Sequence, residues 1–234
     1  MESEHQPDSE TQPGGLPPLT PVEARIIGCL IEKELTVPDT YPLTLNSLVA
    51  ACNQSSNRDP VMSLDEGTVR DALETLKTRN WVFQVTLAGA RVQKFKHNIQ
   101  GKLPRLNKPG VALLAVLLLR GIQTLGELRQ RTDRLQTFPD LESVEAQMKQ
   151  LLTYPEGAVA VCLPAGGGRR VPAYAQTLTG PVSMASAEEY QVVPSVAAPA
   201  APAIDADWKE KVERELDELR AELARIKTSL GMPD

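Results

Sequence analysis

The chain has 234 residues, a formal net charge of −5 at pH 7, and 41% hydrophobic and 24% charged residues. This is the composition of an ordinary soluble globular protein, and the length suits two small domains with their own cores. An acidic balance argues against a simple non-specific nucleic-acid coat protein, because such proteins are strongly basic. The longest apolar run, residues 111–119, is about half of a transmembrane span, so we expect no membrane segment.

The start of the chain and its cysteines both predict a cytoplasmic protein. The first residues, MESEHQPDSE, lack the basic and apolar regions of a secretory signal. Cys29, Cys52 and Cys162 are odd in number and widely separated, which favours reduced thiols over a disulfide framework.

The charge is unevenly distributed along the chain. Residues 1–18 carry −4 and residues 181–234 carry −5, whereas residues 19–180, with fifteen acids and nineteen bases, carry +4. The objection to nucleic-acid binding therefore weakens for the central part of the chain, where the folded domains are expected.

The first half of this central part predicts a winged helix over 19–100. Thr20 and Glu23 form a helix start, and Ser63 with Glu66 predicts a capping box that opens a third helix. After residue 80 the apolar period changes from 3.6 to 2, which predicts a β-hairpin. The predicted elements are helices at 20–34 and 45–52, a polar loop at 53–61, a third helix after Ser63 and a hairpin at 81–97.

The same order of elements recurs after a predicted linker at 101–109, and gives a second predicted winged helix over 110–180. Asp140 is expected to cap its third helix, with Leu141 on the buried face, and three glycines at 166–168 are expected to form the turn of its wing. The other predicted elements are helices at 108–120 and 124–131 and strands at 159–163 and 170–178. The expected fold class is mainly α with small β-hairpin wings: two tandem winged-helix (helix-turn-helix) domains plus a C-terminal heptad helix.

The two ends of the chain predict different behaviour. Residues 1–18 are expected to be a disordered acidic tail, and residues 181–204 an Ala/Pro-rich linker. Residues 205–230 predict a coiled-coil helix that makes a homodimer, with folding back onto the winged domains as the alternative. The predicted dimer seam is Val212, Leu216, Leu219, Leu223, Ile226 and Leu230.

The dimer prediction has a direct test. A chain truncated after Pro181 is expected to be a monomer by light scattering, whereas the full chain is expected to be a dimer, because the heptad seam needs an apolar partner. An unchanged mass per particle would refute dimerisation through this segment.

Several long segments of the central part carry a family resemblance. They are LTPVEARIIGCLIEKELTVPDTYPLTLNSLVAACNQSSNRDPVMSLDE, RVQKFKH, and ALLAVLLLRGIQTLGELRQRTDRLQTFPDLESVE. Together they resemble the bacterial YceH-like family of uncharacterised tandem winged-helix proteins, over about residues 19–180. The resemblance implies a fold and brings no activity with it. It leaves the two terminal segments outside the match, as features specific to this chain.

The sequence favours a non-enzymatic protein. It contains no CxxC or HExxH metal-ligand pattern, and no GKS or GKT follows the glycines at 166–168, where strands flank the turn. Cys29 and Cys52 lie on apolar helix faces and are expected to be small core residues. We therefore expect no catalytic residue, no metal and no cofactor.

Double-stranded DNA is a possible partner of a winged helix, whose third helix enters the major groove. The two third helices fit this role poorly, because their outward positions hold several acids. The bases lie mainly elsewhere, on the predicted wings and on the short helix of the second domain. These bases either contact phosphates or are ordinary solvated surface charges, and the sequence leaves both alternatives open. The candidate nucleic-acid or partner contacts are Arg58, Arg70, Lys77, Arg91, Lys94, Lys96, Arg129, Arg131, Arg134, Arg169 and Arg170.

The loop at 53–60 supports two alternatives. Its amides and Arg58 have the chemistry to bond to base edges or phosphates, or to brace the loop internally. On the fold analogy, the predicted function is a DNA-associated transcriptional or chromosome-related regulator. The alternative is a protein–protein adaptor that resembles the winged-helix subunits of chromosome-condensing complexes and does not contact DNA bases.

Overall fold

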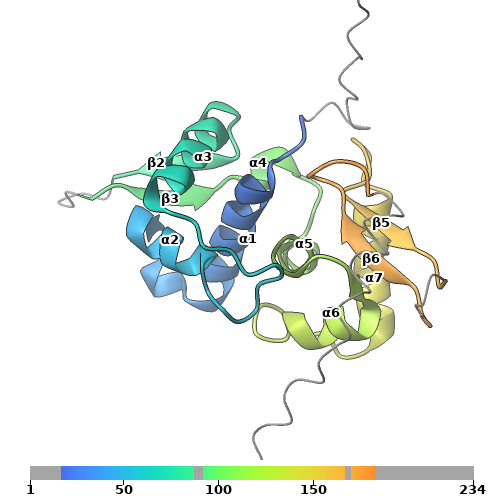
Figure 1. Cartoon of the computed structure of the whole chain (residues 1–234). Helices are drawn as coiled ribbons and strands as arrows, with labels where there is room; N and C mark the ends of the chain where they lie inside the picture. Colours follow the sequence, from blue (N-terminus) through green and yellow to red (C-terminus); the bar gives the residue numbers. More distant parts are fainter. Residues whose placement is uncertain (1–16, 87–91, 167–169, 183–234) are drawn as a thin grey trace, which may run out of the picture. The chain divides into compact units, whose positions relative to one another are not determined.

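Helix α1 (Pro21–Thr36) begins with the cap that the sequence predicts. The Thr20 hydroxyl accepts from the Glu23 N–H at 3.2 Å, and the Glu23 carboxylate accepts from the Thr20 N–H at 2.8 Å. The structure, a computed structural model shown in Figure 1, describes residues 17–86, 92–166 and 170–182. The other elements of the first half are η1 (Pro38–Thr40), β1 (Leu43–Thr44), α2 (Leu45–Cys52), α3 (Glu66–Thr78), β2 (Val82–Val85), β3 (Lys94–His97) and α4 (Ile99–Lys102).

The described residues of the second half repeat this order without the short η1 and α4. Its elements are α5 (Lys108–Arg120), β4 (Gln123–Thr124), α6 (Leu125–Thr132), α7 (Leu141–Leu152), β5 (Ala160–Leu163) and β6 (Ala173–Gln176). Each half carries a three-stranded antiparallel sheet in which the last strand lies in the middle, in the order β1-β3-β2 and then β4-β6-β5. The fold is therefore winged-helix-like, mainly α with small β-hairpin wings, as the sequence predicts.

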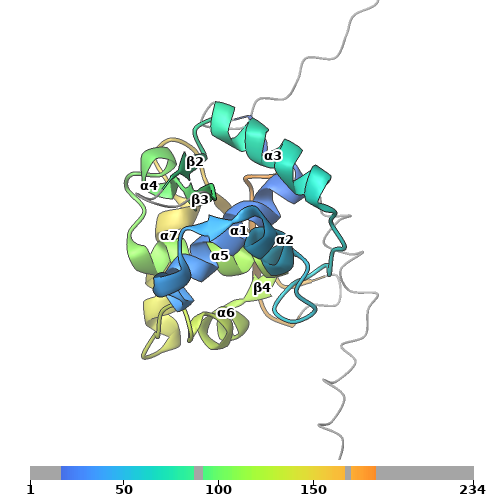
Figure 2. The same cartoon turned by 90° about the vertical axis from the view of Figure 1, so that its left-hand side faces the viewer.

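Helices α1 and α5 pack against each other more extensively than any other pair of elements, and both views place them side by side at the centre (Figures 1 and 2). Both are buried over most of their length: residues 23–31 of α1, which include the charged Glu23 and Arg25, and the apolar residues 110–119 of α5 are buried. At Gly28 the backbone approaches α5 so closely that a Cβ atom would lie 2.8 Å from Leu119 Cγ. The apolar residues of both halves consequently form one continuous core.

Hydrogen bonds between the halves reinforce this core. The Leu19 N–H donates to the Leu178 carbonyl at 2.7 Å, and the Asp59 N–H donates to the Leu119 carbonyl at 2.8 Å. The segment predicted as a linker takes part as well, because Leu103 and Leu106 are buried in the core. The predicted linker therefore contributes these two side chains to the packing.

Two local predictions were wrong. The third helix is capped by Asp65 and not by Ser63, because the Asp65 carboxylate accepts from both the N–H and the hydroxyl of Thr68, at 2.8 and 2.9 Å. Leu141 is 47% exposed, because it is the first residue of α7 and lies beyond the edge of the core. The predicted cap at Asp140 is confirmed.

Some predictions fall on parts of the chain outside the described residues. These are most of the N-terminal tail, the Ala/Pro-rich linker, the heptad seam at 205–230, and two wing-tip arginines, Arg91 and Arg169. Within the described residues, none of the helices has the length and apolar character needed to cross a bilayer.

Candidate nucleic-acid interface

The outward face of α3 is acidic, and its two cations are already paired. The Arg70 guanidinium bonds to the carboxylate of Glu66 one turn earlier. Lys77 Nζ donates to both oxygens of Glu74, at 2.8 and 2.9 Å, and to Gln84 on β2. Acids on the same helix therefore offset the charges that would meet DNA phosphates.

Helix α7 has the same character. Lys149 Nζ lies 3.9 Å from the Glu145 carboxylate, and Glu142 adds a further exposed acid. The Asp140 carboxylate accepts from the Ser143 N–H at 2.7 Å, and this bond holds the pKa of Asp140 below its usual value. Asp140 therefore adds a negative charge at the start of the helix, where it would repel phosphates.

The first wing presents cations of a different kind. Lys94 and Lys96 alternate along β3 with the buried Phe95, so both lysines lie on the outward face of the sheet. Neither forms an ion pair with any described residue. Lys96 Nζ lies 5.9 Å from the centre of the exposed Phe83 ring on β2, a cation–π distance.

The second wing combines a base with an exposed apolar residue. Arg170 is exposed, and its neighbour Val171 is 52% exposed. On the first wing, Val92 is likewise exposed beside the lysine pair. Each wing therefore offers positive charge next to apolar surface.

The three arginines of the α6 region do not form one contact surface. Arg129 braces the loop before α7, because its Nε and Nη2 donate to the carbonyls of Phe138 and Pro139 at 3.2 and 2.7 Å. Arg131 bonds to the Gln123 side chain and lies 3.1 Å from the Glu127 carboxylate. Arg134 is exposed, with neither a hydrogen bond nor an ion pair to the residues that the structure describes.

Arg58 braces the fold internally. Its side chain is fully covered, and its Nη1 and Nη2 atoms donate to the two Glu32 carboxylate oxygens at 3.0 and 2.6 Å. Its remaining donors bond to the carbonyls of Ala51 and Asn57 and to the Gln54 side chain. Because no donor is left to meet a phosphate, we leave Arg58 out of the contact surface.

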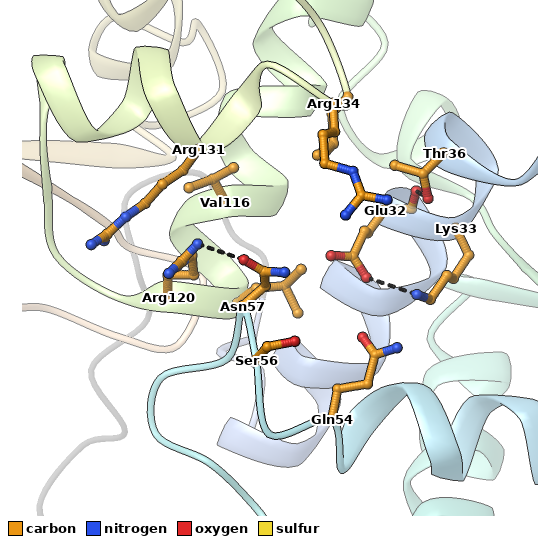
Figure 3. Close-up of a pocket in the computed structure, with 12 residues that line it drawn as sticks. Glu32, Lys33, Thr36, Gln54, Ser56, Asn57, Val116, Arg120, Arg131 and Arg134 are labelled. Atoms are coloured by element: carbon orange, nitrogen blue, oxygen red, sulfur yellow. Dashed lines mark hydrogen bonds and ion pairs between the residues drawn. The ribbon is translucent and has the colours of Figure 1, made fainter. Parts of the chain in front are cut away.

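A pocket of about 200 Å³ lies where the two halves meet (Figure 3). The first half contributes α1 and the loop after α2, and the second half contributes α5, α6 and the turn after α6. The lining residues are Glu32, Lys33, Thr36, Gln54, Ser56, Asn57, Val116, Leu119, Arg120, Arg131, Arg134 and Leu135. Sequence reasoning singled out Arg131 and Arg134 but missed Lys33 and Arg120. A cation at a helix C-terminus also has the ordinary role of offsetting the helix dipole, so it is a weak signal of a site.

No group of three or more potential metal ligands occurs in the part of the chain that the structure describes. Cys29 and Cys52 are buried, as the sequence predicts, whereas Cys162 is exposed. The candidate site is thus a set of charged surfaces and one basic pocket.

Comparison with known proteins shows the family. The family described as "Protein of unknown function, DUF480" matches residues 19–169. A UPF0502 protein of Vibrio atlanticus (strain LGP32) is 43% identical over 212 residues, covering 89% of this chain and 95% of the relative. A UPF0502 protein of Geotalea daltonii is 49% identical over 162 residues, covering 69% of this chain and 73% of the relative.

The Vibrio match corrects one expectation. An alignment of 212 residues is longer than the segment 19–180, so the similarity continues into the terminal segments. Those segments are therefore not wholly specific to this chain. With matches of this length and identity, the chain belongs to the DUF480 family of proteins of unknown function, in agreement with the resemblance drawn from its sequence.

Proposed function

We propose that the chain is a non-enzymatic, DNA-associated regulator built from two winged-helix units, which holds duplex DNA by its wings. The supporting observation is the contrast between Lys94 and Lys96 on β3, which form no ion pair with the residues that the structure describes, and the acid-paired cations of α3 and α7. Phosphate contacts fix a protein on DNA without contacting bases. In this proposal the wings clamp the backbone, and sequence preference is weak.

The proposal also includes a cytoplasmic location for the chain. All three cysteines, including the exposed Cys162, are free thiols, as expected of a reducing compartment. Homodimerisation through 205–230 remains part of the proposal on the strength of the heptad pattern.

The wing lysines have a sharp test. In the full chain, Lys94→Glu with Lys96→Glu is expected to weaken binding to a mixed-sequence duplex and to lower the slope of log affinity against log salt by about 2, because each lost phosphate contact lowers it by about 1. Fluorescence anisotropy over a salt series measures both quantities.

The matched control is Arg70→Glu with Lys149→Glu, which makes the same charge change on α3 and α7. Its affinity is expected to stay near that of the wild type, since both cations already face an acid. A larger loss in this control than in the wing variant, or no duplex binding by the wild type at low salt, would contradict the proposal. A thermal melt of each variant checks its folding.

A second candidate function is a protein–protein adaptor, favoured by the acidic outward faces of α3 and α7. Such a face suits a partner with a basic surface, because opposite charges steer association. This candidate predicts that reversing the charges of Asp71 and Glu74 on α3 abolishes the complex with the protein partner. It also predicts that the wing lysines are not needed for that complex. The DNA proposal predicts the opposite ranking of these two variants in duplex binding.

A further inference from the structure

We propose that the pocket between the two halves binds a small anion carrying phosphate groups, which joins the halves across it. The first support is where its walls come from. Lys33 on α1 and Gln54 after α2 line one side, and Arg120 at the end of α5 lines the other (Figure 3). None of α3, β3 and α7 lines the pocket, so it is distinct from the wing and third-helix surfaces of the proposed function, although Arg131 and Arg134 were also candidate nucleic-acid contacts.

The second support is an excess of positive charge. The cations that line the pocket are Lys33, Arg120, Arg131 and Arg134. Among the lining residues, Glu32 is the sole carboxylate, and its two oxygens are already held by Arg58 from behind. The hydrogen bonds and charge of Arg58 outweigh burial and hold the pKa of Glu32 below its usual range. Glu32 thus stays ionised and is shared by Arg58 and Lys33, whose Nζ lies 3.4 Å from Glu32 Oε2, while Arg131 pairs with Glu127. These two carboxylates face Arg58 and the four lining cations, so positive charge remains in excess around the pocket.

The third support is the state of Arg120. Burial, and then the charge of Arg131, lower the pKa of the Arg120 guanidinium. Its Nη1 donates to the Asn57 side-chain oxygen at 2.9 Å, which fixes the guanidinium against the pocket wall. A bound anion would relieve the repulsion between these two cations, and this relief contributes to binding.

The fourth support is the availability of Arg134. In Figure 3 its guanidinium extends over the pocket toward Glu32, and the structure gives it no hydrogen bond or ion pair among the described residues. An arginine fork matches phosphate oxygens in two parallel bonds. Arg134 is therefore the side chain best suited to close on an anion held by Arg120 and Lys33.

The size of the pocket limits the class of ligand that it can hold. Its volume of about 200 Å³ is below the roughly 300–1,000 Å³ of pockets that enclose drug-sized ligands. The hydroxyls of Thr36 and Ser56 and the amide of Gln54 add polar partners around the cations. A compact pyrophosphate-like group fits this chemistry, either free or as the phosphate end of a nucleotide that leaves its base outside.

The test is a calorimetric titration of the full chain with inorganic pyrophosphate at low ionic strength. We expect one site per chain, and about tenfold weaker binding in Arg134→Gln, because a charge-assisted bond is lost. Lys149→Gln removes an exposed cation outside the pocket and is expected to bind as the wild type does. Lys33→Gln is a second variant within the pocket, and it is expected to weaken binding too.

Further arms separate the sources of the phosphate. Tighter binding of a nucleoside triphosphate than of pyrophosphate would identify a nucleotide, and equal affinities would identify the phosphate group alone. No binding of either probe, or equal losses in Arg134→Gln and Lys149→Gln, would overturn the proposal. The wing double variant is expected to keep its pyrophosphate affinity, so a failure of DNA binding and a failure of this site are distinguishable.

Discussion

Replacing Gly28 with valine is expected to destabilise the chain by about 1–3 kcal/mol or more, because overpacking a dense core forces neighbours to shift. A Cβ atom at this position would lie 2.8 Å from Leu119 Cγ and 2.9 Å from Leu119 Cδ2, and valine adds two methyl groups beyond it. The strain falls on the contact between α1 and α5, where the two halves share one core. Urea unfolding followed by circular dichroism measures the loss.

Gly126→Ala is the matched control within another helix. No atom lies within 4 Å of a Cβ built at Gly126, so the substitution is expected to leave stability unchanged or to raise it by up to about 1 kcal/mol, since alanine favours a helix. Equal stability of the Gly28 variant and the wild type would mean that α1 and α5 do not pack as closely as described.

The secondary structure was largely predictable because the first residues of the helices carry a local chemical signal. Thr20 and Asp140 both cap helices as expected, and the predicted bounds of helix α5, 108–120, are those observed. These features depend on residues within four positions of each other, which a sequence displays directly. The Ser63 prediction failed because Asp65 lies two residues later and offers two oxygens for the same task.

The joining of the two halves could not be predicted in the same way. The apolar sequence of a helix such as α5 predicts that the helix is buried, but it does not predict which element the helix packs against. Leu103 and Leu106 lie in the predicted linker at 101–109, and their burial depends on tertiary packing.

The candidate site likewise has one part that the sequence predicts and another part that it does not. The pairing of Arg70 with Glu66 follows from their i,i+4 spacing and was accessible from the sequence. The pocket brings Lys33 and Arg120 to one place from helices far apart in the chain, and no local pattern encodes such a meeting. The pocket could therefore be identified only once the packing of α1 against α5 was known.

Replacing Arg58 with methionine is expected to cost about 3–5 kcal/mol, the usual range when one partner of a buried ion pair is removed. The change leaves the Glu32 carboxylate without the two donors at 3.0 and 2.6 Å, and leaves the Ala51 carbonyl without its side-chain donor. The loop between α2 and α3 would lose its main internal brace. Guanidinium unfolding at pH 7 gives the free-energy difference.

Arg70→Met is the matched control, because it removes the same guanidinium from an exposed pair with Glu66 and is expected to change stability by about 0–1 kcal/mol. The two variants also differ in their pH dependence. The pKa of Glu32 is lower in the folded chain than in the unfolded chain, so its pairing stabilises the fold above the unfolded pKa, near 4.3. That stability is lost as the pH falls through the lower folded pKa. Arg58→Met should therefore flatten the acid limb of the stability profile, and Arg70→Met should preserve it. An unaltered acid limb in Arg58→Met would mean that the pair with Glu32 does not carry this stability.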